Sequence, residues 1–197
     1  MSKAILMSIK PKWCELIASG KKIVEVRKTK PKLETPFKVY VYATWNGSSR
    51  EILVKDGGTL FVADYRTPAY RASGKVIGEF VCDSIDRYDY DYCPHPEIGM
   101  NYDCGDSWWE IADEDLENAC LTYEDFKKYA WRETVMYGWH ISDLVIYDEP
   151  RELREFFYAC DKPKGSDCSV CLDHRENRCK AITRPPQSWC YVEEVGQ

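Results

Sequence analysis

Lys22, Glu25 and Arg27 are the residues whose types and spacing most directly suggest chemistry. Glu25 and Arg27 lie two positions apart in the β-branched stretch 23–27, and alternate residues of a strand face the same side. Lys22 comes just before this stretch and can reach that side as well. Two cations beside one carboxylate would form an anion-binding site with an internal acid or base. The structural alternative is a surface ion pair with a solvated lysine.

The cysteines form a second group with metal-binding chemistry. Four of the ten fall within a short stretch: Cys160, Cys168, Cys171 and Cys179. The central Cys-x-x-Cys pair can hold one ion from a tight turn, and the two flanking cysteines can complete a tetrahedral thiolate set for a structural Zn²⁺. Free thiols or two disulfides remain alternatives, and His174 or Cys190 could replace one ligand.

The C-terminal segment offers a third set of candidates. Arg184 carries a planar guanidinium suited to phosphate, and Trp189 carries a ring on which a base could stack. Two prolines between them fix the approach of the last strand. Trp189 could equally fill the core at the seam of a barrel.

The charge is distributed unevenly along the chain. The formal net charge is -6, which by itself argues against a nucleic-acid partner. Residues 83–118 carry a net charge of -11, however, and residues 1–32 carry +7. Because the local field steers a polyanion, the basic body remains a candidate surface for nucleic acid. The acidic segment could cover the cleft or bind a basic protein.

The elements that must position these residues are short. Strands are predicted over 4–9, 23–27, 37–43, 75–82, 137–147 and 189–192. Helices are predicted from Pro11 to Gly20, from Thr122 to about residue 131, and near Pro150 towards Phe157. The acidic, aromatic segment 83–118 has no steady period and is expected to hold little regular structure. Short strands with few helices predict an α+β fold with a small mixed barrel.

The sequence resembles the ASCH domain of the PUA-like superfamily. The motif Gly20-x-Lys22-x-x-Glu25-x-Arg27 matches the family's GxKxxExR hallmark, and the resemblance continues through the strand at 75–82, the segment 137–144 and the tail 184–190. It implies one domain over 1–197, built as a small β-barrel flanked by helices. Lys22, Glu25 and Arg27 would line a cleft. Residues 83–118 and 160–182 then read as an acidic insertion and a cysteine-rich, zinc-binding appendage.

The resemblance also implies a choice of activities. Members of the family are proposed to bind RNA, some look like metal-dependent ribonucleases, and one branch deacetylates N4-acetylcytidine. In that branch a threonine nucleophile stands three residues after the motif lysine. Glu25 holds that place here, and a carboxylate does not easily replace a hydroxyl nucleophile. Glu79 could match the acidic partner of that branch.

These observations predict a protein that binds single-stranded RNA or a nucleotide. The expected binding residues are Lys10, Lys22, Glu25, Arg27, Arg184 and Trp189. If the protein is an enzyme, a ribonuclease or a nucleoside-modifying hydrolase, Lys22 and Glu25 are the expected catalytic residues, with Mg²⁺ or Mn²⁺ for a nuclease. A protein-interaction adaptor that uses the acidic insertion is the third reading. No apolar run approaches the ~20 residues of a membrane span, so a cytoplasmic location without a membrane partner is expected.

Overall fold

The computed structural model describes residues 2–45, 72–91, 108–159 and 180–195, together with the backbone of two strands between 52 and 63. The cysteine-rich segment, with Cys160, Cys168, Cys171 and Cys179, lies outside the described residues. In the part of the chain that is described, no helix is long and apolar enough to cross a membrane.

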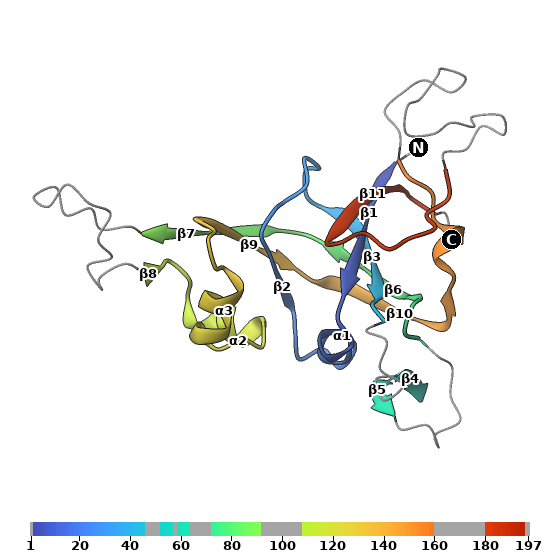
Figure 1. Cartoon of the computed structure of the whole chain (residues 1–197), viewed down its shortest axis with the longest axis horizontal. Coiled ribbons are helices and arrows are strands. Elements are labelled where there is room, and N and C mark those ends of the chain that lie inside the picture. The colour runs from blue at the N-terminus through green and yellow to red at the C-terminus, as the bar shows by residue number, and fades with distance from the viewer. Residues whose placement is uncertain are drawn as a thin grey trace, which may run out of the picture.

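A five-stranded sheet forms the centre of the molecule (Figure 1). Its strands are, in spatial order, β10 (Ser142–Arg151), β6 (Val76–Cys82), β3 (Phe37–Ala43), β1 (Lys3–Ile9) and β11 (Trp189–Glu193). β1 and β3 run parallel, with Ile5 opposite Val39, and the other neighbours are antiparallel. The N-terminal strand therefore lies between an early strand and the last one, which brings the two ends of the chain into one sheet.

A second sheet carries the motif strand at its outer position. Its order is β2 (Val24–Arg27), β9 (Val135–His140), β7 (Ile85–Asp91) and β8 (Trp108–Trp109). β9 runs on into β10 after a single residue, so the two sheets are joined and curl around a shared core. A separate hairpin is formed by β4 (Ile52–Asp56) and β5 (Thr59–Ala63).

The helices are short and lie at the ends and faces of the sheets. They are α1 (Pro11–Ala18), α2 (Asp113–Asn118), α3 (Tyr123–Tyr129) and the 3₁₀ turn η1 (Leu153–Glu155). Pro11 suits the first turn of α1, where a backbone N–H would have no partner within the helix. Thr122 caps α3, since its hydroxyl accepts a hydrogen bond from the Asp125 amide (3.1 Å). α2 and α3 lie together against the second sheet (Figure 1).

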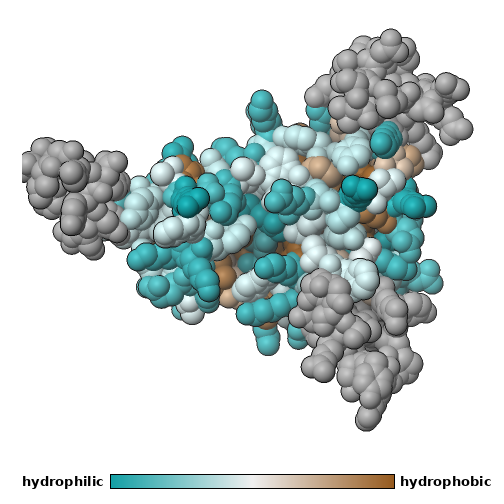
Figure 2. Space-filling view, viewed as in Figure 1, coloured by the Kyte–Doolittle hydropathy of each residue, from teal (hydrophilic) through white to brown (hydrophobic). Residues whose placement is uncertain are grey.

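The core divides into apolar clusters on the two faces of the strands. Trp139 is fully buried and packs edge-on against Phe37, which links β9 to the central sheet. Val24 and Val26 face the other way and pack with Phe126 and Leu116 under α2 and α3. The face seen in Figure 2 is mostly hydrophilic, with small apolar patches between the polar side chains. Because adjacent residues of a strand face opposite sides, Glu25 and Arg27 lie on the side of β2 that faces away from Phe126.

The structure confirms a mixed α+β fold with curled sheets and few helices. The expectation of little regular structure over 83–118 is wrong for its described part, because β7, β8 and α2 lie there. The many acidic side chains of β7 mask the alternation of apolar and polar residues that normally indicates a strand in a sequence. The strand predicted over 137–147 is two strands that break at Ile141, and the helix predicted near Leu153 is one 3₁₀ turn followed by extended chain.

Candidate functional site

The turn between α1 and β2 sets the position of the motif. Gly20 has a φ of 71°, the left-handed conformation that glycine adopts without a Cβ penalty, and it ends α1. The amides of Lys21 and Lys22 both bond back to the Leu16 carbonyl at 3.0 Å. This tight reversal places Lys22 directly before β2, on the same side as the charged side chains of the strand.

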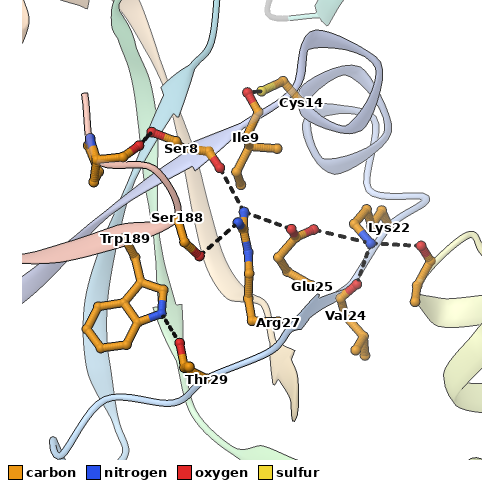
Figure 3. A network of polar contacts seen from close by, with 12 residues as sticks. Ser8, Ile9, Cys14, Lys22, Val24, Glu25, Arg27, Thr29, Ser188 and Trp189 are labelled. Carbon is orange, nitrogen blue, oxygen red and sulfur yellow. Dashed lines mark hydrogen bonds and ion pairs between the residues drawn. The ribbon is translucent and has the colours of Figure 1, made fainter. Parts of the chain in front are cut away.

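The three charged residues of the motif form one buried network (Figure 3). Glu25 forms an ion pair with each of the two cations: its Oε2 lies 3.3 Å from Lys22 Nζ, and its Oε1 lies 2.9 Å from Arg27 Nη2. The exposed fractions of Lys22, Glu25 and Arg27 are 2%, 6% and 7%. The predicted grouping on one face is confirmed, and the alternative of a surface ion pair with a solvated lysine is wrong.

Three polar groups surround the Lys22 ammonium. Besides Glu25, its ammonium donates to the carbonyls of Val24 (2.8 Å) and Ala119 (2.7 Å). The Trp13 ring lies 5.1 Å from the same nitrogen, within the range of a cation–π contact. The Lys22 charge is thus held in one place by groups from β2, the end of α2 and α1.

Arg27 joins the motif to the two ends of the chain. Its Nη2 donates to the Ser8 carbonyl (2.8 Å), and its Nη1 lies 3.4 Å from the Ser188 hydroxyl. The Ser8 hydroxyl in turn donates to the Pro186 carbonyl (2.7 Å), so the C-terminal segment is fixed beside the motif. Among the described residues, the buried Nε of Arg27 has no hydrogen-bond partner.

A cavity of about 470 Å³ lies over this network. Its lining combines cations, aromatic rings and small polar groups: Ser8, Lys10, Lys12, Trp13, Lys22, Glu25, Val26, Arg27, Thr44, Leu121, Asp125, Tyr129 and Gln187. Lys10 and Lys12 are exposed and stand at its mouth, whereas Lys22 and Arg27 are buried beneath it. Burial raises the pKa of Tyr129, so its hydroxyl stays neutral and can donate a hydrogen bond.

The other residues predicted for the site are placed differently. Lys10 lines the cavity, but Arg184 and Trp189 do not. The Trp189 ring packs against Trp139 and Tyr191, and its Nε1 donates to Thr29 (3.0 Å), which is the core-filling role. The tail enters the site instead through the residues just before Trp189, which are Gln187 and Ser188.

Several lining residues are not among those expected from the sequence. Trp13 lies in the helix expected after Pro11 without belonging to a motif, and nothing in the sequence sets Tyr129 apart from the other tyrosines. Glu79 lies away from the cavity, where it pairs with Lys38 (2.8 Å) and accepts a hydrogen bond from Tyr147. A resemblance of Glu79 to a catalytic acid therefore has no geometric support here.

The comparisons place the chain in a family. The family model of the ASCH domain matches residues 7–148, more than half of the chain. The chain therefore belongs to the ASCH domain family. Similar solved structures include two point mutants of the ASCH protein from Zymomonas mobilis. One has a TM-score of 0.53 at 16% identity, covering 98% of this chain and 92% of that chain. The other has a TM-score of 0.51 at 15% identity, covering 97% and 89%. At these identities the likeness shows the fold alone. No curated protein matches the chain.

Proposed function

We propose that this protein binds single-stranded RNA or a nucleotide in the cavity over Lys22, Glu25 and Arg27. The observation that carries the proposal is the pairing of fixed, buried cations with aromatic walls in one cavity. Its volume of about 470 Å³ lies within the ordinary range for ligand sites. A phosphate needs the cations, and an unstacked base needs the rings.

The charges of the cavity favour an anion. Four cations line it against two carboxylates, those of Glu25 and Asp125. The Glu25 charge is shared between Lys22 and Arg27, so the network as a whole retains positive charge. Phosphate oxygens accept charge-assisted hydrogen bonds from cations of this kind.

The aromatic walls suit a base. Trp13 is half-buried on α1, and Tyr129 is 42% exposed at the end of α3. Both line the cavity, each from a different helix. Stacking on such rings is tolerant of sequence, which supports recognition of single strands rather than of one sequence in a duplex.

The same geometry favours binding over catalysis. Lys22 donates hydrogen bonds to two carbonyls, and both oxygens of Glu25 are ion-paired. The network is therefore already fixed by contacts within the protein. A divalent ion beside Glu25 would also compete with two cations already in place. Ribonuclease and hydrolase activities are therefore the alternatives to simple binding.

The test measures binding of a fluorescently labelled single-stranded RNA by anisotropy over a range of salt concentrations. Lys10→Ala and Lys12→Ala are the informative variants, because both lysines are exposed and their removal leaves the buried network intact. Lys128→Ala is the matched control, an exposed lysine on α3 that does not line the cavity. Each pocket variant should weaken binding and reduce the slope of log affinity against log salt by about 0.7.

Three outcomes separate the readings. Equal affinity and slope for Lys10→Ala, Lys12→Ala and wild type would overturn the proposal and favour the acidic segment 83–118 as a protein-binding surface. Cleavage of the RNA in Mg²⁺ or Mn²⁺ that is lost in Glu25→Gln, while circular dichroism shows that the variant is still folded, would instead establish a nuclease. Trp13→Ala should weaken binding by about 5- to 150-fold if a base stacks there.

A further inference from the structure

A second polar cluster lies on the opposite face of the β2–β9 pair from the motif. It consists of Asp86 on β7, Asp115 on α2 and His140 on β9, and their potential ligand atoms all lie within 4.8 Å of one another. His140 stands opposite Val24 in the strand pairing, whereas Glu25 stands opposite Trp139. Because adjacent residues of a strand face opposite sides, the cluster is separate from the cavity.

The cluster brings two carboxylates together with one imidazole. His140 Nε2 bonds to Asp86 Oδ2 at 2.5 Å. No lysine or arginine of the described chain forms an ion pair with Asp86 or Asp115. A divalent ion would add positive charge between these carboxylates.

The buried hydroxyl of Tyr88 borders the cluster. Tyr88 is 3% exposed, and the Asp115 carboxylate is the hydrogen-bond neighbour of its Oη. The phenol therefore belongs to the polar surroundings of Asp115.

A glycine opens the path for that hydroxyl. Asp86 and Tyr88 alternate along β7 and so share a face, as do Gly138 and His140 along β9. A Cβ at Gly138 would lie 2.2 Å from Tyr88 Oη, so the phenol passes over the missing side chain towards the His140 end of the strand. The fold thus directs a buried hydroxyl towards this group of potential metal ligands.

We propose that Asp86, Asp115 and His140 bind a divalent first-row transition-metal ion of the Mn²⁺ or Zn²⁺ type. Two carboxylate oxygens and one imidazole nitrogen are a suitable donor set, and the imidazole disfavours Mg²⁺ and Ca²⁺. The Tyr88 hydroxyl would face the ion or a water bound to it. The side chains of His140 and Asp86 are 31% and 46% exposed, so water can fill the remaining positions. The ion would clamp α2 onto β7 and β9.

The experiment titrates the full-length, metal-stripped protein with Mn²⁺ and follows free Mn²⁺ by electron paramagnetic resonance. Mn²⁺ is the probe because the thiolates of the cysteine-rich segment prefer softer ions such as Zn²⁺. Asp115→Asn and His140→Gln should each weaken Mn²⁺ binding at least tenfold. Glu114→Gln is the matched control, since it removes an exposed charge from the same helix outside the cluster, and it should bind as wild type does.

A stability measurement gives a second readout. Mn²⁺ should raise the Tm of wild type and of Glu114→Gln but not that of Asp115→Asn. Tyr88→Phe removes the hydroxyl that neighbours Asp115 and should bind Mn²⁺ more weakly than wild type does. The proposal is overturned if wild type binds no Mn²⁺ at millimolar concentration, or if Asp115→Asn and His140→Gln bind it equally well. Neither result bears on RNA binding in the cavity.

Discussion

Replacing Lys22 by methionine tests whether the motif lysine holds the site together. Methionine keeps the length of the side chain and removes the charge, so little of the effect comes from lost packing. The substitution leaves the carbonyls of Val24 and Ala119 without their donor and leaves Glu25 with Arg27 alone. Breaking a buried ion pair by removing one partner costs about 3–5 kcal/mol. That is a large share of the stability of an ordinary domain.

The assay is urea unfolding of the full-length protein, followed by circular dichroism. Lys28→Met is the matched control, because Lys28 pairs with Glu133 at 3.1 Å but the two side chains are 40% and 36% exposed. Exposed pairs contribute about 0–1 kcal/mol. We therefore expect Lys22→Met to lower the midpoint strongly, with an unchanged slope, and Lys28→Met to leave it nearly unchanged.

The reasoning is refuted if Lys22→Met and Lys28→Met lose the same free energy of unfolding to within 1 kcal/mol, the upper end for an exposed pair. Lys22 would then be free to act as a ligand-binding cation rather than as a fixed one. Glu25→Gln provides a second test, since it would leave two cations facing a neutral amide. It should also destabilise the protein by several kcal/mol, with the same unchanged slope.

Two further predictions concern the cysteines. Burial raises the pKa of the Cys82 and Cys190 thiols to about 12, so both stay protonated near neutral pH. Mass spectrometry should find them alkylated by iodoacetamide far more slowly in the folded protein than in urea. Their contribution to stability should be lost as the pH rises from the ordinary thiol value of 9.0 towards 12. Separately, the protein should purify with about one zinc ion, bound by the cysteine-rich segment. Equal zinc content in wild type and in a Cys168→Ser, Cys171→Ser double variant would contradict that assignment.

The sequence determined the elements whose signals are local. The alternation of Val and Tyr predicted β3 over 37–43 to the residue, and Pro11 with Gly20 predicted where α1 begins and where the chain turns. Thr122 predicted the start of α3 through its capping hydrogen bond. The two-residue spacing of Glu25 and Arg27 predicted that both charges share a face. Each of these depends on neighbours within a few positions.

Local signals failed where the deciding contact is remote. The segment of β7 is rich in charged residues and was expected to hold little regular structure. Pairing with β9 nevertheless makes it a strand, on which Arg87 and Asp89 form an ion pair. The helix expected near Leu153 became one 3₁₀ turn, because Phe157 and Tyr158 form bridges to Ala181 and Val192. Pairing across the sheet outweighed helical periodicity there.

The tertiary structure alone decided what the motif lysine can do. From the sequence Lys22 reads as an exposed cation, but in the fold it donates a hydrogen bond to the Ala119 carbonyl, 97 residues away. The cavity likewise needs Tyr129 and Gln187 from distant segments. The cluster of Asp86, Asp115 and His140 exists only because α2 packs on the face of β7 and β9. A sequence specifies which charges share a strand face, but their burial and partners depend on long-range packing, and that packing decides whether a charge is a ligand or a structural clamp.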